Sequence, residues 1–306
     1  MDRDDRPSLA LWLQRCGLPR LDAQVLIAQV LGLSRAQQAA HPEQAIGAGE
    51  LTRLDSLAAR LSAGEPLAYV LGVREFYGLE FGVTRDVLIP RPETELLVDT
   101  ALERLDALPE GQSPRVLDLG TGSGAIAIAL AHRRPAVQIW ALDASAAALN
   151  VAQENAQHLL DPRRPGGAIR FVQSDWFGEL RAMEMEAPRF DCIVSNPPYV
   201  AQGDPHLPAL RFEPALALTG GNPSADGLGD IRRIIAQAGR FLAPAGWLLL
   251  EHGYDQAAAV RSELADKGYG AVQSGLDLAG IERVTGGRWP EAVLEKPETD
   301  KTRGQP

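Results

Sequence analysis

Lysine is scarce in this sequence. Lys267, Lys296 and Lys301 are its only lysines, so arginine carries nearly all of the positive charge, and the formal net charge is −10. Surfaces that bind nucleic-acid phosphates broadly are usually basic. The composition therefore argues against a large phosphate-binding surface, and we expect no direct nucleic-acid partner. A local basic patch is still compatible with it.

Cysteines are also few, and long apolar runs are absent. Cys16 and Cys192 lie far apart, with no metal-ligand spacing around either, so we expect buried free thiols in a reducing cytoplasm and no metal site. No apolar run approaches the ~20 residues that span a bilayer, and the charged N-terminus has no apolar signal core. The sequence therefore predicts a cytoplasmic protein without membrane contact. Because no exposed apolar stripe stands out, we expect a monomer.

The first part of the chain has a helical pattern. Apolar residues recur at helical spacing up to about residue 64, as in Leu51, Leu54 and Leu57. We find no catalytic constellation in this segment and expect a packing or partner-recognition module. Residues 67–90, including Tyr69 to Val73, are rich in β-forming residues broken by glycines, which indicates a hairpin.

From residue 97 to about 290, strand-like and helix-like segments alternate. We expect strands at 115–119, 137–142, 169–172, 191–195 and 247–251, and helices at 125–132, up to 155 and near 230–242. Such alternation is typical of an α/β fold with a parallel, helix-covered sheet. The polar residues 291–306 are predicted to form a flexible tail.

A glycine-rich turn lies between the first strand of this region and its helix. It contains Gly120, Gly122 and Gly124, and glycines there let a ligand approach the backbone and the helix N-terminus. Asp143 closes the next strand, 19 residues after Gly124, where its carboxylate is placed to accept both ribose hydroxyls of an adenosine. The pattern predicts a nucleoside-cofactor site.

The glycines do not decide which nucleoside binds, since their spacing also satisfies the dinucleotide fingerprint of dehydrogenases. Three observations favour S-adenosylmethionine over NAD. Asp118 precedes the glycines, where an acid helps to hold the methionine ammonium group. Asp175 and Trp176 follow a third strand and offer a polar and an aromatic side chain to the adenine. The turn that ends the fourth strand has no evident proton relay for hydride chemistry.

That turn reads Asn196-Pro197-Pro198-Tyr199. Neither proline has an N–H, so the turn is rigid and rich in acceptors. The Asn196 side-chain oxygen and the Pro197 carbonyl are predicted to accept the two N–H groups of a planar amide or nucleobase NH2. Tyr199 is predicted to pack against that group and exclude water. Acceptors fixed in advance need no reorganisation during the reaction.

Together these motifs resemble the class I S-adenosylmethionine-dependent methyltransferases, and more narrowly the peptide chain release factor N5-glutamine methyltransferases. The resemblance covers nearly the whole chain. Residues 65–72, 75–78 and 89–95 are similar to the linker of that family, and residues 118–124, 174–177, 195–199, 212–214 and 249–253 to its catalytic core. DNA and RNA amino-methyltransferases share the Asn-Pro-Pro-Tyr turn but not the linker.

The resemblance implies a helical N-terminal docking domain (1–66), a β-hairpin linker (67–90) and a Rossmann-like methyltransferase domain with a seven-stranded sheet (91–290). The implied protein substrate is the glutamine of the Gly-Gly-Gln loop in class I peptide chain release factors. The alternatives are a nucleic-acid adenine N6 methyltransferase and a non-catalytic S-adenosylmethionine-binding module.

The expected site consists of two groups of residues. Those expected to hold the cofactor are Asp118, Gly120, Thr121, Gly122, Ser123, Gly124, Asp143, Asp175, Trp176 and Asn196. Those expected to bind substrate are Asn196, Pro197, Pro198 and Tyr199, with Asn196, Pro197 and Tyr199 catalytic.

Some charged residues leave two interpretations open. Arg91, Glu93 and Glu95 form either a charged surface helix start or part of a helix across the cofactor pocket. Glu251 is either a pocket wall residue or a buried structural carboxylate. Ile281 and Glu282 depart from the family pattern, and the loops 161–167 and 220–227 are longer than usual.

Overall fold

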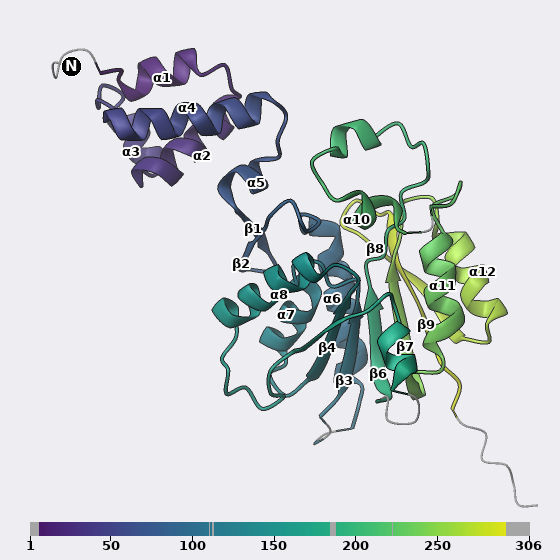
Figure 1. Cartoon of the computed structure of the whole chain (residues 1–306). Helices are drawn as coiled ribbons and strands as arrows, with labels where there is room; N and C mark the ends of the chain where they lie inside the picture. Colours follow the sequence, from purple (N-terminus) through teal and green to yellow (C-terminus); the bar gives the residue numbers. More distant parts are fainter. Residues whose placement is uncertain (1–5, 110, 112, 184–187, 222, 292–306) are drawn as a thin grey trace, which may run out of the picture.

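The computed structural model describes residues 6–109, 111, 113–183, 188–221 and 223–291. Within these residues, a group of N-terminal helices stands apart from a larger body built on a twisted sheet, with a short helix and a two-stranded hairpin between them (Figure 1). The predicted tail lies almost wholly outside the described residues. None of the described helices is long and apolar enough to cross a membrane.

The N-terminal helices have a hydrophobic core of their own, as the helical spacing predicted. Leu9, Leu26 and Leu54 are fully buried in it, and the Trp12 indole donates a hydrogen bond of 2.8 Å to Asp55. Side-chain caps mark the helix starts: Ser8 and Ser34, for example, accept from backbone N–H groups of the first turn. The helices are α1 (Leu9–Arg15), α2 (Arg20–Leu31), α3 (Arg35–Ala40) and α4 (Ala48–Ser62).

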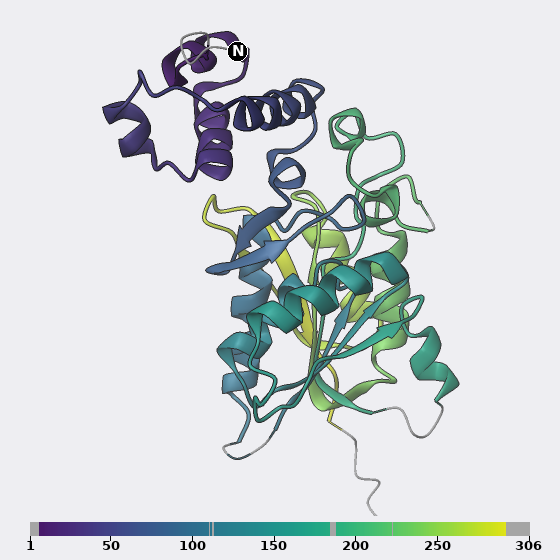
Figure 2. The same ribbon diagram turned by 60° about the vertical axis from the view of Figure 1, so that its left-hand side comes forward.

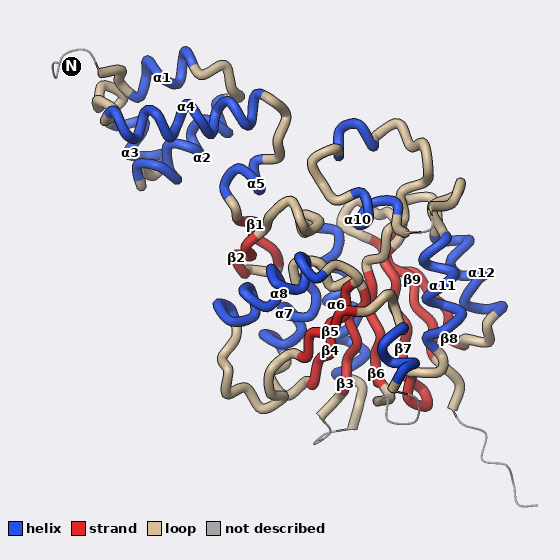
Figure 3. Tube along the Cα trace, in the orientation of Figure 1, coloured by secondary structure: helices blue, strands red, loops and turns tan. Residues whose placement is uncertain are grey.

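The hairpin is shorter than the sequence indicated. Its strands are β1 (Val73–Phe76) and β2 (Leu79–Gly82), whereas Tyr69 lies in a short helix, α5 (Leu67–Leu71), so the strand interpretation of that segment was wrong (Figure 3). Proline precedes α5, and Gly72 ends it in the left-handed conformation. The tertiary contacts of Tyr69 also outweigh its preference for strands: its side chain is buried, and its hydroxyl donates a 2.6 Å bond to the Val87 carbonyl.

The main sheet has seven strands in the order β5-β4-β3-β6-β7-β9-β8. The strands are β3 (Arg115–Leu119), β4 (Gln138–Asp143), β5 (Arg170–Gln173), β6 (Phe190–Ser195), β7 (Leu242–Glu251), β8 (Gly270–Leu276) and β9 (Glu282–Arg288). The first five are parallel, as expected, but β9 runs antiparallel to both β7 and β8. No strand after residue 251 was predicted from the sequence, and the two strands found there form the antiparallel edge of the sheet.

Helices cover both faces of the sheet (Figures 1 and 2). Neighbouring strand residues alternate between two buried clusters: Val116 and Val194 belong to one, and Leu117 and Ile193 to the other. The helices and single turns of this body are η1 (Pro92–Thr94), α6 (Glu95–Asp106), α7 (Ala125–Arg133), α8 (Ala146–Leu159), α9 (Gly178–Ala182), η3 (Leu207–Leu210), α10 (Ala215–Thr219), α11 (Gly229–Ala238) and α12 (Ala257–Asp266).

The strand order places a crevice between β3 and β6. The chain leaves β3 towards β4 and β5 on one side, and β6 pairs with β3 on the other side. Ligands of open α/β sheets bind at such a reversal, beyond the carboxyl ends of the strands. The glycine-rich turn after β3 and the Asn196 turn after β6 therefore meet at one place, and the Ser195 hydroxyl donates a 2.7 Å bond to the Leu119 carbonyl between them.

Candidate functional site

A pocket of about 490 Å³ opens at this reversal point. Nine of the predicted site residues line it: Gly120, Thr121, Gly122, Ser123, Asp143, Asp175, Trp176, Asn196 and Pro198. Asp118, Gly124, Pro197 and Tyr199 are not among the residues that line it. The structure thus brings most of the residues predicted for the cofactor together with Asn196 and Pro198 at a single pocket, whereas the predicted catalytic residues Pro197 and Tyr199 lie outside its lining.

The glycine-rich turn is wound tightly enough to expose its backbone. The N–H groups of Gly120 and Thr121 both donate to the Leu142 carbonyl, at 2.8 and 2.9 Å, so the turn is tied to β4. Gly124 has a φ of +81°, and a Cβ there would lie 2.9 Å from the Ile128 side chain. Only glycine satisfies both the backbone conformation and the close packing of α7 at this position.

Asp143 lies at the end of β4 with its carboxylate on the pocket wall. Its two oxygens accept from the backbone N–H groups of Gly122 and Ser145, each at 2.9 Å. Each oxygen has one further lone pair to offer to a hydroxyl group. Burial raises the pKa of Asp143, and the backbone donors oppose that rise.

Asp118 is fully buried beneath the glycine-rich turn. Its Oδ2 accepts a 2.7 Å bond from the Thr121 hydroxyl, whereas its Oδ1 has no regular hydrogen-bond partner among the described residues, although the Ala127 backbone N–H lowers the pKa of the carboxyl. Burial, with a smaller contribution from Asp143, raises the pKa of Asp118 to about 7. A buried carboxyl oxygen without a partner costs free energy, so this site fits a cation or donor that completes it.

Trp176 and Asp175 form the opposite wall with helix α11. The Trp176 indole donates 3.1 Å to Asp230, and its backbone has a positive φ of 51°, which few residues other than glycine adopt. The Asp175 carboxylate is held by Arg233 in a bidentate ion pair of 2.8 and 2.6 Å. Asp175 therefore faces the pocket as half of an ion pair, which the sequence did not indicate.

The Asn196 turn shapes the other end of the pocket. Asn196 and Pro198 line it, and Pro197 is buried. The Asn196 Nδ2 donates 3.1 Å to the Thr94 hydroxyl, and no described residue donates to its Oδ1. Tyr199 is not among the residues that line the pocket, and its hydroxyl lies 3.4 Å from the Glu251 carboxylate.

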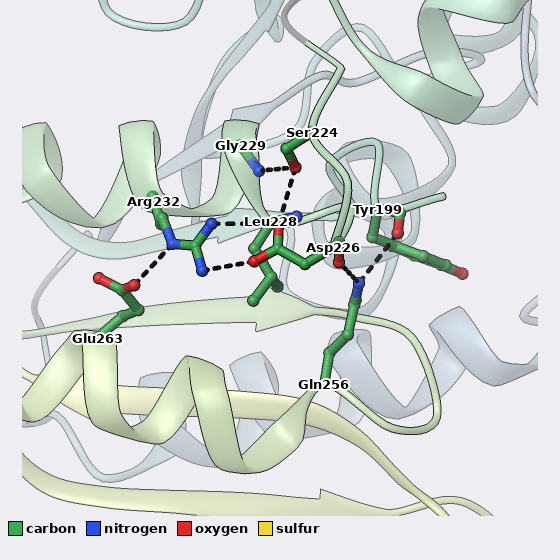
Figure 4. A network of polar contacts seen from close by, with 8 residues as sticks. All are labelled: Tyr199, Ser224, Asp226, Leu228, Gly229, Arg232, Gln256 and Glu263. Atoms are coloured by element: carbon green, nitrogen blue, oxygen red, sulfur yellow. Dashed lines mark hydrogen bonds and ion pairs between the residues drawn. The ribbon is translucent and has the colours of Figure 1, made fainter. Parts of the chain in front are cut away.

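The loop after Tyr199 is fixed by a polar network (Figure 4). The Gln256 amide donates to the Tyr199 and Asp226 carbonyls at 3.0 and 2.8 Å. Arg232 pairs with Asp226 at 2.7 Å and with Glu263 at 2.7 Å, and this pairing holds the pKa of Asp226 far below its ordinary value. Asp226 is thus tied to α11 through Arg232 and to Gln256, the residue that precedes α12, and Gln256 also holds the Tyr199 backbone.

The linker, here including residues 91–94 that join the hairpin to α6, contributes residues to the site, and one of them was not predicted from the sequence. Arg91 and Thr94 line the pocket, and Arg91 is also paired with Glu213 at 2.5 Å. Glu95 instead accepts from the Tyr77 backbone N–H at 2.8 Å and has a structural role. Thr94 was not singled out, because a hydroxyl among charged residues carries no chemical signal of its own.

The hairpin touches the glycine-rich turn through Asn155 of α8. The Asn155 amide exchanges two hydrogen bonds with the Gly82 backbone, at 2.8 and 3.0 Å, and donates a third of 2.9 Å to the Ser123 carbonyl. The linker is thus joined to the cofactor loop by one buried side chain. Nothing in the sequence pointed to this residue, since its partners lie far away in the chain.

Two family models match the chain. The PrmC N-terminal domain matches residues 10–72, and the Methyltransferase small domain matches residues 94–211. The boundary between the two matches falls within the linker, between α5 and α6.

Several bacterial relatives are similar over nearly their whole length. A release factor glutamine methyltransferase of Burkholderia pseudomallei is 53% identical over 287 residues, which cover 93% of this chain and 97% of the relative. Relatives of the same name from Bordetella pertussis and Escherichia coli are 50% and 44% identical, covering 89% and 90% of this chain and 95% of each relative.

Solved structures share the fold at low sequence identity. The catalytic domain of hMettl16, in complex with an RNA hairpin, has a TM-score of 0.54 and is 16% identical, covering 80% of this chain and 84% of its own. A human methyltransferase 10 domain containing protein has a TM-score of 0.51 and is 19% identical, covering 71% of this chain and 92% of its own. At such identities the likeness concerns the fold alone.

Proposed function

The chain belongs to the release factor glutamine methyltransferases, and we propose that it draws the methyl group from S-adenosylmethionine and delivers it at the Asn196 turn. It is an enzyme that methylates the side-chain amide nitrogen of a release factor glutamine. The observation that carries the proposal about the site is that Asn196 offers an unoccupied acceptor into a pocket whose other end has the features of a nucleoside site.

The residues present fit S-adenosylmethionine. Asp143 offers lone pairs to the ribose hydroxyls, the Trp176 wall offers an aromatic side chain to the adenine, and the unpaired Oδ1 of Asp118 suits the ammonium group. When bound, S-adenosylmethionine supplies a methyl group that is activated by its positive sulfur. The dinucleotide alternative gains no support, because the relatives that match nearly the whole chain are named as methyltransferases.

The Asn196 turn acts on the substrate amide by positioning and polarising it. A carboxamide nitrogen is a weak nucleophile because its lone pair is delocalised into the carbonyl. Asn196 Oδ1 and the Pro197 carbonyl each accept one N–H of the substrate amide, which orients the nitrogen and stabilises the positive charge that develops on it. As the new C–N bond forms, the S–CH3 bond breaks and S-adenosylhomocysteine is left. The amide proton becomes acidic only at that stage and then passes to water, so no strong base is needed beforehand.

Affinity for S-adenosylmethionine is expected to fall in mild acid because of Asp118. With a pKa of about 7, this carboxyl carries a proton below pH 7, and the proton must leave before the ammonium group pairs with it. Calorimetry at pH 7.5 and 6.0 is expected to show affinity about eightfold weaker at the lower pH. Asp118→Asn should bind more weakly and lose this pH dependence. A wild-type affinity that is equal at both pH values would contradict the assignment.

Labelled S-adenosylmethionine tests the function directly. Purified enzyme is offered a class I release factor, the same factor with its loop glutamine changed to alanine, and duplex DNA. We expect label on the intact factor alone. Label on the alanine variant would place the modification at another residue, and label on DNA would favour the nucleic-acid alternative.

The remaining parts of the proposal concern partners and place. We propose that residues 1–66 dock the release factor, since these helices have their own core and stand apart from the sheet (Figure 1). Both cysteines are free thiols, which agrees with a reducing cytoplasm as the place of the reaction. Deleting the docking domain should raise KM for the release factor more than it lowers kcat.

A further inference from the structure

Asn196 receives a contact from a different part of the chain. Its Nδ2 donates to the hydroxyl of Thr94, a residue that is 4% exposed and lies 102 positions earlier in the sequence. Thr94 ends the turn η1, which opens helix α6. The orientation of the Asn196 amide is therefore set by the linker as well as by its own turn.

Glu251 completes the arrangement from the end of β7. Its side chain is 1% exposed, and its Oε1 lies 3.4 Å from the Tyr199 hydroxyl. The Thr94 hydroxyl lowers the pKa of the Glu251 carboxyl as a donor to it, although the pair does not meet the geometry of a regular hydrogen bond. Oε2 has no regular hydrogen-bond partner among the described residues, so the carboxylate has acceptor capacity to spare for Thr94.

The hydrogen-bond donors among Asn196, Thr94 and Glu251 can be arranged in only one order. A threonine hydroxyl has a single proton, and an ionised carboxylate only accepts. When Thr94 directs its proton to Glu251, its oxygen is left to accept from Asn196 Nδ2. A flipped Asn196 would set its carbonyl oxygen against that same oxygen with no proton between them, which costs the free energy of a lost buried hydrogen bond.

We propose that Thr94 and Glu251 are positioning residues, which hold the Asn196 amide with Oδ1 towards the substrate and anchor Tyr199 on the other side of the same turn. The proposal rests on the function assigned above to Asn196. It gives the linker a direct part in the reaction, because the segment that precedes the methyltransferase sheet determines which face of a catalytic amide meets the substrate.

The electrostatics of Glu251 agree with such a role. Burial raises its pKa to about 7, while the Thr94 and Tyr199 hydroxyls lower it. Two charged side chains also face it: Glu93 of the linker raises this pKa, and Arg283 of β9 lowers it. Protonation below pH 7 gives the carboxyl a proton of its own and ends its acceptor-only character, so kcat is expected to fall on the acidic side.

Three variants separate this role from simple packing. Thr94→Val keeps the shape and loses the hydroxyl, Thr94→Ser keeps the hydroxyl, and Glu251→Gln keeps the shape and cannot titrate. We expect Thr94→Val to lower kcat for release factor methylation at least about tenfold, with Thr94→Ser within about threefold of wild type. The affinity of both Thr94 variants for S-adenosylmethionine should stay within about twofold of wild type. In Glu251→Gln, kcat should no longer fall as the pH drops below about 7. Equal kcat in the valine and serine variants would overturn the proposal, as would a parallel loss of kcat and cofactor affinity.

A second measurement needs no substrate. Asparagine occurs at only four positions in the chain, so protein labelled with 15N-asparagine gives few side-chain amide signals, and Asn196→Asp identifies the relevant pair. We expect slow proton exchange of the Asn196 amide in the wild type and in Thr94→Ser, and at least about tenfold faster exchange in Thr94→Val. Unchanged exchange in Thr94→Val would overturn the proposal. If the wild type failed to methylate any release factor, the proposed site chemistry would be wrong. The exchange measurement would still test whether Thr94 accepts from Asn196 Nδ2.

Discussion

Replacing Asn196 by aspartate is expected to lower kcat by about 10²–10³-fold, the usual effect of removing one preorganised polar group from an active site. The carboxylate still accepts, but it has no N–H to donate to Thr94, so the Thr94 hydroxyl turns towards it and the link to Glu251 is lost. Single-turnover methylation of a release factor measures this loss.

Cofactor binding should survive that change. The ribose and ammonium contacts lie at the other end of the pocket, so calorimetry should give an affinity for S-adenosylmethionine within about threefold of wild type. Asn150→Asp is a matched control, because it adds the same charge at an exposed position of α8. Unchanged turnover in Asn196→Asp would contradict the acceptor role of the turn.

The second large effect is expected at Asp143. Removing its carboxylate with Asp143→Ala takes away the acceptor for the ribose hydroxyls and releases the Gly122 and Ser145 N–H groups that it holds. Two lost charge-assisted hydrogen bonds correspond to about 3 kcal/mol, or roughly 100-fold in affinity for S-adenosylmethionine. Asp143→Asn keeps one acceptor oxygen and should lose only about tenfold.

Calorimetry of the two variants beside Asp161→Ala tests this assignment. Asp161 has an exposed side chain outside the pocket, so its loss should leave the affinity unchanged. Thermal unfolding without ligand shows whether the glycine-rich turn depends on Asp143 for its own stability. Affinity of Asp143→Ala within about threefold of wild type would mean that the ribose is held elsewhere.

The fold was predictable where the signal is local. Alternating apolar segments and the glycine-rich turn predicted β3, α7 and β4 to within one or two residues. The strands β8 and β9 gave no such signal, because β8 is largely exposed and contains glycine and serine. Tyr69 gave a local signal that was misleading. It was predicted to lie in a strand because of its β-propensity, but its contact with Val87 holds it in a short helix.

What the sequence could indicate about the site follows the same division. Asn196, Asp143 and the glycines stand at strand ends, where their chemistry is recognisable from their neighbours in the chain. Tyr199 was predicted to pack against the substrate amide, whereas its side chain lies beside Glu251 and not on the pocket wall. Thr94 carries no signal at all until the structure brings it to Asn196.

By itself, the sequence determined the elements that depend on adjacent residues: the glycine-rich turn, the rigid turn at Asn196, the carboxylate at the end of β4, and the separation of the N-terminal helices from the sheet. Only the tertiary structure decided how those elements act on one another. Strand order brings the ends of β3, β6 and β7 to one edge, and the linker returns across it. Backbone geometry is set over a few residues, whereas the orientation of a side-chain amide depends on partners about 50 to 100 positions away, which packing alone brings into contact.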